Sequence, residues 1–403
     1  MSDVNFLDKL LDGEALEWKA IGEVFDLKNG YTPSKAIPEY WTTGEVPWFR
    51  MEDIRANGRV LKKATQSVSV SAVKGELVPA NSLIMSTTAT IGEHALIEVP
   101  FLTNQQITSF SVSNAYRDKI NVKFIFHYFF KFGKWCIENA NKNGGMGIIG
   151  LAKLKQFEIP IPCPDNPQKS LEIQAEIVRI LDAFTELTAE LAAELAARKK
   201  QYNYYRDQLL IFEDDEVEWP TLGALAENLD SMRKPITSGL REPGDIPYYG
   251  ASGIVDYVKD YIFDCDLLLV SEDGANLLAR NTPIAFSIGG KSWVNNHAHV
   301  LKFKTYAERR YVEYYLNSID LTPYISGAAQ PKLNKKSLES IRIPNPSLED
   351  KKRIVEILDK FDALAGSIRD GLPREIELRQ KQYEHYRDLL LSFSKPEAFG
   401  GIK

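Results

Sequence analysis

Two stretches of the chain carry apolar residues at helical spacing over an unusual length. Within residues 171–212, apolar side chains fall mostly three or four positions apart, which is the period of an α-helix with one apolar face. At 1.5 Å per residue, a helix of this length extends roughly 60 Å. A second stretch with the same period runs from Ile354 to Leu364. We therefore predict two long helices, each of which needs a partner along its length.

Local signals mark where these helices begin and where the second is interrupted. Asn166-Pro167 and Ser170 are both suitable starts for the first helix, because Asn and Ser cap well and Pro suits the first turn. Gly371-Leu372-Pro373 interrupts the second stretch, because Pro inside a helix removes a hydrogen bond. We expect helicity to resume at Arg374 and to continue to about Phe393.

The two long helices are nearly identical at their ends. Residues 198–210 return as 379–391 with nine of thirteen positions identical, and residues 177–184 return as 354–361. The segment between these two motifs is four residues longer in the second copy. This duplication predicts two similar units in tandem. Antiparallel pairing of the two helices would form a spacer with one head at each end.

The segments outside the helices are turn-rich and have short apolar runs, which predicts two mixed α/β heads. Landmarks recur in the same order in both heads: residues 46–48 match 246–248, and residues 102–104 match 294–296. The second match aligns Asn104 with Asn296. The chain also begins with a segment that resembles the end of a repeat, as if a circle of two units had been cut there. The expected fold class is α+β with internal pseudo-twofold symmetry.

This organisation predicts five segments. They are a first head at residues 1–163, whose N-terminal segment completes the circular repeat; a first long helix at 164–212; a second head at 213–344; a second long helix at 345–395; and a tail at 396–403.

Composition is that of an ordinary globular protein, with 44% hydrophobic and 26% charged residues. No apolar run approaches the ~20 residues that span a bilayer, and the N-terminus lacks a secretion signal. We therefore expect a cytoplasmic location and no membrane partner. The net charge of −6 argues against a generic nucleic-acid binder, but residues 213–218 alone hold five acids. DNA binding remains compatible with this charge if partner proteins share the phosphate contacts.

The sequence carries no catalytic signature. Residues 287–292 resemble the end of a phosphate-binding loop, but Ala285 stands where that motif requires Gly. The Asn-Pro-Pro-aromatic motif of amino-methyltransferases is absent. His297 and His299 have the alternating spacing of metal ligands, but no third ligand completes a set, so a hydrogen-bonding pair is favoured. We expect no catalytic residue, no metal site and no cofactor bound by this chain.

Both heads concentrate hydrogen-bonding side chains on their turn-rich segments. Arg and Lys recognise guanine edges, Asn and Gln recognise adenine, and acids accept from cytosine. Taken singly, each residue is more typical of a solvated turn, and it is the gathering in both heads that favours DNA contact. The candidates are Thr32, Ser34, Lys35, Arg50, Arg55, Thr87, Thr88, Gln105, Lys142 and Asn143 in the first head, and Arg233, Lys234, Tyr249, Ser252, Asp273, Asn276, Arg280, Lys291, Asn296 and Gln330 in the second.

These features together resemble the specificity subunit of a type I restriction–modification system, over essentially the whole chain. The similarity rests on the repeated helix ends at 198–210, on Gly-Leu-Pro-Arg-Glu-Ile-Glu-Leu-Arg at 371–379, and on head segments such as 248–253 and 293–299. Residues 188–195 resemble the four-residue repeat of the type IC branch, with Ala192 where Thr is usual.

The resemblance implies two target-recognition domains joined by two long antiparallel spacer helices. Each head would recognise one half of a split, asymmetric site in double-stranded DNA. The helices would set the gap and bind two methyltransferase subunits, while S-adenosylmethionine, ATP and magnesium would reside on partner subunits, which include motor-nuclease subunits. The spacer and subunit-interface candidates are Tyr202, Tyr205, Arg206, Tyr383, Tyr386, Arg387, Leu191 and Leu195.

A different class of function is also compatible with the sequence. A helical scaffold whose two heads bind proteins or carbohydrates would show the same repeat. Weak, salt-insensitive binding to genomic DNA would favour that alternative, because phosphate contacts make binding salt-dependent.

Overall fold

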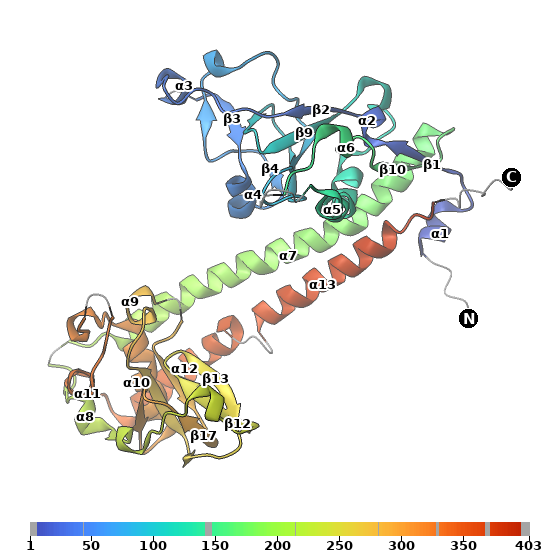
Figure 1. The fold of residues 1–403 in the computed structure, drawn as a ribbon. Helices are drawn as coiled ribbons and strands as arrows, with labels where there is room; N and C mark the ends of the chain where they lie inside the picture. The colour runs from blue at the N-terminus through green and yellow to red at the C-terminus, as the bar shows by residue number, and fades with distance from the viewer. Residues whose placement is uncertain are drawn as a thin grey trace. The chain divides into compact units, whose positions relative to one another are not determined.

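The chain divides into two compact units, each of which contains one head (Figure 1). The computed structural model describes residues 6–42, 44–141, 147–213, 215–280, 282–327, 330–366 and 371–395. Unit 1 comprises Met1–Ala189 and Glu377–Lys403, and unit 2 comprises Glu190–Ile376. Each unit therefore combines a head with the first part of one long helical segment and the last part of the other. The boundaries between the compact units fall within the long helical segments, whereas the expected domain boundaries separate the heads from the helices.

The head of unit 1 contains two sheets and a two-stranded ribbon. The larger sheet has the order β2-β9-β6-β7-β4, in which only the β4–β7 pair is parallel. Its strands are β2 Phe25–Asn29, β9 Ile107–Val112, β6 Ser82–Ser86, β7 His94–Ile97 and β4 Val60–Leu61. The smaller sheet has the order β5-β3-β8, with β5 Ser67–Val68, β3 Val46–Phe49 and β8 Leu102–Thr103. The ribbon pairs β1 Leu16–Ala20 with β10 Glu158–Pro162.

Helix α5 (Val122–Asn139) covers the larger sheet of unit 1 and supplies much of its core. Asn121 caps it, since its Oδ1 accepts the amide of Lys123 at 3.0 Å. Phe129 and Phe132 of α5 are fully buried and meet Phe110 of β9 edge to face. The shorter helices of this head are α1 Phe6–Leu11, α2 Ile21–Val24, α3 Glu39–Thr42, α4 Met51–Asn57 and α6 Leu151–Leu154, with 3-10 turns η1 Val70–Ala72 and η2 Asn114–Tyr116.

The head of unit 2 has two four-stranded sheets. One has the order β11-β18-β15-β16, with β11 Glu227–Asn228, β18 Ala298–Lys302, β15 Leu267–Ser271 and β16 Ala285–Ile288, all paired antiparallel. The other has the order β13-β12-β17-β14, with β13 Gly253–Val258, β12 Pro243–Gly250, β17 Lys291–Val294 and β14 Phe263–Asp264. In this sheet β12 and β17 are parallel, as β3 and β8 are in unit 1.

Helix α10 (Tyr306–Ser318) covers the first of these sheets and also packs against helix α12 (Leu348–Gly366). A capping box starts α10, because Thr305 and Glu308 satisfy each other's backbone amides. The short elements of this head are α8 Leu222–Leu225, α9 Asn276–Ala279, α11 Lys335–Glu339, η3 Asp230–Met232, η4 Ser238–Leu240 and η5 Thr322–Tyr324.

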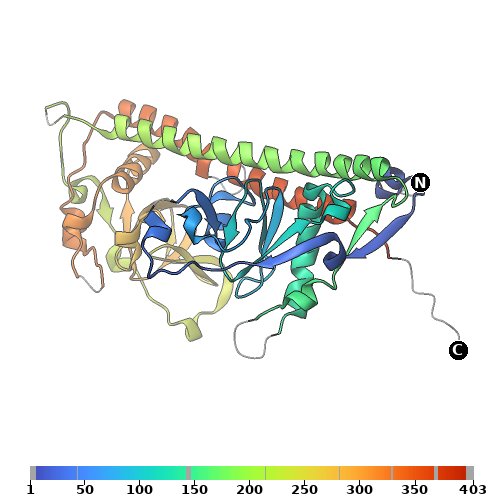
Figure 2. The ribbon, with the colours of Figure 1, turned by 90° about the horizontal axis from the view of Figure 1, so that it is seen from above.

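The first long helix, α7, spans Pro167–Leu210 without interruption (Figure 2). It begins at the earlier of the two expected starts, because Asn166 Oδ1 accepts the amide of Lys169 at 3.1 Å and Pro167 occupies the first turn. The second stretch consists of α12 and of α13 (Leu372–Leu390). Helicity resumes at Leu372 rather than at Arg374, because Pro373 lies in the first turn, where its missing amide has no helical partner. The centre of the expected interruption, residues 367–370, lies outside the described residues.

Each unit pairs the start of one long segment with the end of the other. In unit 1, Phe184 of α7 stacks on Tyr386 of α13, with ring centroids 5.1 Å apart. In unit 2, Phe361 of α12 stacks on Tyr205 of α7 at 5.6 Å. Within unit 1, α7 and α13 run in opposite directions (Figure 1). The duplicated helix ends therefore make the same contact in both units, as the repeat predicts.

The N-terminal segment completes the repeat in unit 1. Leu7 of α1 shares a core with Leu390 and Leu391 at the end of α13, and β1 then pairs with β10 just before α7 begins. In unit 2 the chain that follows α7 makes the corresponding bridges, from Glu218 to Asn345 and from Thr221 to Arg342.

Candidate nucleic-acid interface

In the head of unit 1, a set of hydrogen bonds joins four segments at one edge of the fold. After β8, the amide of Asn104 donates to the carbonyl of Phe49, at the end of β3, at 3.3 Å. The Asn104 Oδ1 atom accepts the amide of Gln106 at 3.1 Å, which is an Asx turn. The Gln106 carbonyl accepts the amide of Thr87 at 2.9 Å, and the Thr87 carbonyl accepts the amide of Ile149 at 3.1 Å. We call this set the turn frame.

The head of unit 2 contains the same turn frame built from different residues. The amide of Asn295 donates to the carbonyl of Tyr249 at 3.0 Å, and its Oδ1 accepts the amide of His297 at 2.8 Å. The His297 carbonyl accepts the amide of Glu272 at 2.9 Å, and the Glu272 carbonyl accepts the amide of Leu333 at 2.8 Å. All four hydrogen bonds correspond one to one between the heads. The repeat therefore extends into the heads as backbone geometry, even where the sequences differ.

The turn frame corrects the sequence alignment of the two heads. The sequence aligned Asn104 with Asn296, but the hydrogen bonds show that Asn104 corresponds to Asn295. Both are buried, at 9% and 6% exposure, because their amides hold the turn. The alignment was wrong by one position because Asn295 and Asn296 are adjacent identical residues, and only the turn contacts distinguish them.

The two residues at each turn tip point their side chains away from the core. Gln105 and Gln106 are exposed in unit 1, and Asn296 and His297 are exposed in unit 2. Thr32 donates its hydroxyl to Gln105 Oε1 at 2.5 Å. These tips carry donors and acceptors of the kind that recognise base edges.

The entry segment of each head lies beside the turn frame. The amide of Tyr31 donates to the carbonyl of Thr103 at 2.8 Å, and the amide of Lys234 donates to the carbonyl of Val294 at 3.3 Å. These bonds place Lys234, and Thr32 directly after Tyr31, next to the frames of their heads.

The other candidates in unit 1 divide between the turn frame and its surroundings. Thr87 belongs to the frame, and the adjacent Thr88 forms a bridge to Ile148. Arg50 directly follows β3, with its guanidinium 5.5 Å from the centroid of the Trp48 ring. Elsewhere in the head, the carbonyl of Ser34 accepts the indole N–H of Trp41, and the next residue, Lys35, is exposed. The Arg55 guanidinium on α4 lies 3.4 Å from the Glu93 carboxylate. Lys142 and Asn143 lie outside the described residues.

Arg233 in unit 2 is held by an ion-pair network behind the turn frame. Its Nη1 lies 2.6 Å from Glu272 Oε2 and donates to the carbonyl of Ala298 at 2.9 Å. Lys332 approaches the other oxygen of Glu272 at 3.1 Å. Burial raises the pKa of Glu272, but the Arg233 hydrogen bond and nearby positive charges outweigh burial and hold the pKa below its usual value. Arg233 therefore has structural contacts that could not be predicted from the sequence.

The remaining candidates in unit 2 also divide into two groups. Tyr249 belongs to the frame, and Asp273 directly follows the frame residue Glu272. Ser252 lies in the hairpin between β12 and β13. Gln330 lies in the segment whose Lys332 forms a bridge to Asp273. Asn276, Arg280 and Lys291 make contacts of other kinds. The Asn276 side chain closes a turn with Thr282 at 3.0 Å, Arg280 donates to the carbonyl of Ile319 at 2.8 Å, and Lys291 lies 4.6 Å from the Tyr261 ring.

Both histidines considered as metal ligands make hydrogen bonds inside the head. The buried His299 lies between the Asp230 carboxylate, at 2.6 Å, and the carbonyl of Leu333, at 2.7 Å. His297 Nδ1 lies 2.8 Å from Asp273 Oδ2. Among the described residues, no group of three or more His, Cys, Asp or Glu side chains is arranged to hold a metal ion.

Each head docks onto the long helices through one acidic residue of the repeat. In unit 1, Asp182 of α7 accepts from His127 at 3.0 Å and from Lys123 at 2.7 Å, both on α5. The Tyr383 hydroxyl reaches the other nitrogen of His127 at 2.9 Å. Burial raises the pKa of Asp182, but these hydrogen bonds outweigh it, so the net effect lowers the pKa. We call this group the unit 1 docking cluster.

The equivalent residue in unit 2, Asp359 of α12, has different partners. Arg310 donates to it at 2.8 Å, and the hydroxyls of Tyr306 and Tyr314 both donate to it at 2.7 Å. All three partners lie on α10. Burial again raises the pKa of Asp359, and these hydrogen bonds more than offset the rise. This group is the unit 2 docking cluster.

The predicted subunit-interface residues therefore serve partly within the units. Arg387 is 5% exposed and lies 4.4 Å from the centroid of the Phe130 ring, and Tyr202 packs edge-on against Phe361. Tyr205 and Tyr386 keep 42% and 40% of their surfaces exposed. Tyr383 and Arg206 contact their own units, and Leu191 and Leu195 are partly exposed on α7.

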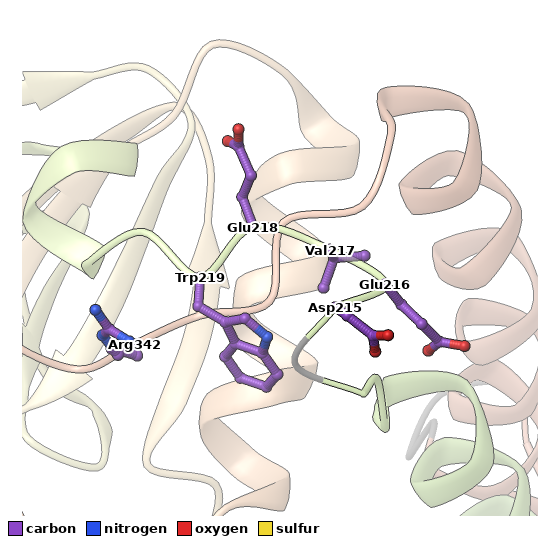
Figure 3. Close-up of a pocket in the computed structure, with 6 residues that line it drawn as sticks. All are labelled: Asp215, Glu216, Val217, Glu218, Trp219 and Arg342. Carbon is purple, nitrogen blue, oxygen red and sulfur yellow. The ribbon is translucent and has the colours of Figure 1, made fainter.

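The acidic run after α7 lines a pocket of about 590 Å³ in unit 2 (Figure 3). Asp215, Glu216 and Glu218 contribute carboxylates, and Trp219 and Arg342 complete the wall with Val217. A pocket with this lining does not attract phosphate, because like charges repel. The pocket shares no residue with the turn frame of this head.

No helix in the described part of the chain is long and apolar enough to cross a membrane.

Comparison with known proteins identifies the family. The profile described as "Type I restriction modification DNA specificity domain" matches residues 14–198 and again 215–378. The chain is 44% identical over 378 residues to the type I restriction enzyme EcoprrI specificity subunit of Escherichia coli, covering 91% of this chain and 93% of that one. It is 34% identical to the EcoR124I/EcoR124II specificity subunit of the same species, covering 98% and 99% of the two chains.

The fold agrees with that of solved proteins of this kind. The crystal structure of a type I restriction–modification S subunit from M. genitalium superposes with a TM-score of 0.59 at 16% identity, covering 95% of this chain and 98% of that one. A chain from a structural study of type I R-M complex assembly gives 0.60 at 15% identity, covering 93% and 97%. The chain belongs to the family of type I restriction enzyme specificity subunits.

Proposed function

We propose that this chain recognises DNA for a type I restriction–modification enzyme. The head of each unit would contact one half of a two-part, asymmetric site in double-stranded DNA, and the long helices would set the gap between the halves. The observation that carries the proposal is the turn frame. It repeats the same four hydrogen bonds in both heads, three between backbone groups and one in which an Asn side chain accepts a backbone amide, while the exposed side chains at its tips differ.

The pattern of shared backbone and different tips fits recognition of two different sequences. Backbone contacts position a protein on DNA, whereas side chains that reach base edges determine sequence preference. Two heads with the same frame would approach the duplex in similar ways. Their different tips would then select different bases.

We further propose that the chain is non-catalytic and acts with partners in the cytoplasm. Two methyltransferase subunits would bind the helical part, and motor-nuclease subunits would join the complex. S-adenosylmethionine, ATP and magnesium would be bound by those partners. The repeated aromatic stacks, with Tyr205 and Tyr386 still about two-fifths exposed, would offer similar contacts to two copies of one partner.

The four-residue repeat of α7 supports a role in setting the gap. Residues 188–195 lie within α7, and the division between the two compact units falls at Ala189, inside this repeat. Four more residues lengthen a helix by about 6 Å and rotate it by about 40°. One base pair adds about 3.4 Å and 34°.

Inserting one more Ala-Ala-Glu-Leu after Leu195 should therefore lengthen the unspecified gap by about one base pair. The bases recognised on either side should stay the same, because the insertion leaves both heads unchanged. Mapping methylated sites in cells that carry the variant measures the gap. An unchanged gap would exclude this role for the repeat.

Salt-dependent binding by the complete methyltransferase complex tests DNA recognition itself. The full chain, purified with its methyltransferase subunits, should bind its methylation site far more tightly than unrelated DNA. Affinity should fall steeply between 50 and 200 mM salt, by about 10³-fold or more if six or more phosphates are contacted. Weak binding that does not respond to salt would instead favour a scaffold whose heads bind proteins or carbohydrates.

A further inference from the structure

The turn tips of the two heads occupy equivalent places, and these places are not the ones that sequence alignment suggested. Each tip begins with the residue directly after the buried Asn of the Asx turn, which is Gln105 in unit 1 and Asn296 in unit 2. Both residues are exposed, and both carry a carboxamide. The two heads therefore present the same functional group at the same point of the frame.

Neighbouring frame residues have their polar groups engaged by the head itself. The Thr87 hydroxyl donates to the carbonyl of Gln106 at 3.2 Å, and Glu272 is held by Arg233 and Lys332. Asn104 and Asn295 use their side chains to hold the turns. None of the four frame hydrogen bonds uses the side chain of Gln105 or Asn296, so this tip position can change without loss of the frame.

The residues around each carboxamide differ between the heads. In unit 1, the Thr32 hydroxyl donates to Gln105 Oε1, which fixes the orientation of the amide. In unit 2, His297 follows Asn296 and is oriented by Asp273 at 2.8 Å. The shared position thus has different surroundings, which suits contact with different neighbouring bases.

We propose that Gln105 and Asn296 are the equivalent base-contacting residues of the two heads and that each recognises an adenine. A carboxamide matches adenine in the major groove, because it donates to N7 and accepts from the N6 amino group. The assignment rests on the proposed DNA-recognition function and adds the residues and the base. The two positions act independently, each on its own half of the site.

Isosteric substitutions test this assignment. Gln105→Glu and Asn296→Asp replace the amide donor by an acceptor and leave the shape of each side chain nearly unchanged. The full chain is purified with its methyltransferase subunits, and methylation rates are measured on DNA that carries the wild-type site and every single-base change of it. Q105E should reduce the preference for adenine at one position of one half-site by about 5- to 150-fold. N296D should do the same in the other half-site only.

Two further variants separate base recognition from charge and from folding. Gln66→Glu makes the same chemical change at another exposed position of the first head, where the backbone carbonyl of Gln66 accepts the Trp48 amide at 3.0 Å. It should leave the site preference unchanged. Gln105→Ala adds no charge and should still reduce the preference at the same base.

The outcomes distinguish this proposal from the proposed function. If wild-type complex methylates a defined site but Q105E and Q105A leave every base preference intact, the assignment of Gln105 is overturned. A uniform loss on all substrates with Q105E, together with an unchanged preference with Q105A, overturns it as well. If wild-type complex shows no site preference at all, the proposed function itself fails.

Discussion

The two units share the backbone of their turn frames and the aromatic stacks of their helix ends, but they differ in the side chains around each. At the docking clusters, Asp182 is held by His127 and Lys123, whereas Asp359 is held by Arg310 and two tyrosines. The acid belongs to the duplicated helix and is retained, while its partners belong to the diverged heads. The duplicated helix therefore places an acid at the same position in both units, and each head supplies different hydrogen-bond donors to it.

The difference between the docking clusters predicts unequal stability. Arg310 is only 12% exposed, whereas Lys123 is 43% exposed and His127 stays neutral more readily, because burial lowers its pKa. When Asp359 is removed, Arg310 keeps its ion pairs with Glu313 at 2.5 Å and with Asp362 at 3.2 Å, so the loss is that of hydrogen bonds to a carboxylate, which contribute about 1.5–3 kcal/mol each. Leaving a buried neutral donor unpaired costs about 1–3 kcal/mol.

Asp359→Ala removes the acceptor of three donors and should therefore destabilise unit 2 more than Asp182→Ala destabilises unit 1. Asp182→Ala removes the acceptor of two donors and should destabilise unit 1 by about 1–3 kcal/mol. Hydrogen exchange of α10 and α5, measured in each variant, reports the two units separately. Each variant serves as the control for the other. Equal losses in both units would show that the different partners are energetically equivalent.

Mild acid should weaken unit 1 before unit 2. His94 of β7 is buried among the rings of Phe126, Phe129 and Phe130. Burial, together with the charge of Arg59, lowers its pKa to about 3. Below about pH 6.5 the unfolded chain takes up a proton there while the folded chain does not. Stability is therefore lost as pH falls from about 6.5 toward 3, by about 2 kcal/mol at pH 5.

The carboxylates of unit 2 respond at lower pH. The pKa values of Asp230 and Asp359 are lowered in the folded state, since hydrogen bonds outweigh the effect of burial. Their contribution is fully present above about pH 4 and is lost only as pH falls further. Hydrogen exchange at pH 7 and pH 5 should show faster opening of α5 than of α10. His94→Gln should remove most of that pH dependence, and a persistent effect would assign it to another group.

The smallest expected loss of stability should be nearly the same in both units. Tyr386→Ala and Tyr205→Ala remove equivalent stacks on Phe184 and Phe361. Because both tyrosines are about two-fifths exposed, each change should cost only about 1 kcal/mol. Thermal unfolding of the two variants should show similar shifts. A clearly larger shift in unfolding temperature for one variant would mean that the two stacks contribute unequally to stability.

Periodicity and capping predicted the long helices well because those signals are local. The duplicated ends also predicted two similar units, and Phe184 and Phe361, which occupy the same place in the two copies, make equivalent stacks. The turn frame could be predicted from the sequence only in part. Strand β8 has two residues, too few to fix a register by alternation, so the adjacent Asn295 and Asn296 were aligned incorrectly.

The contacts of the charged candidates were not predictable from the sequence. Arg233 meets Glu272 and the carbonyl of Ala298, residues far along the chain that only the folded sheet brings together. Arg280 likewise meets the carbonyl of Ile319. Charge and residue type identified them as candidates for DNA contact, but the ion pairs and hydrogen bonds that hold them depend on tertiary structure.

The most direct test of two different heads on one shared frame is the set of sites methylated in living cells. Sequencing that resolves methylated bases, in cells that carry this chain together with the proposed methyltransferase subunits and in cells that lack it, reports the recognised sequence directly. We predict one motif with two dissimilar halves separated by an unspecified gap of fixed length. A continuous motif, two identical halves, or no motif that depends on this chain would contradict the division of recognition between the two heads.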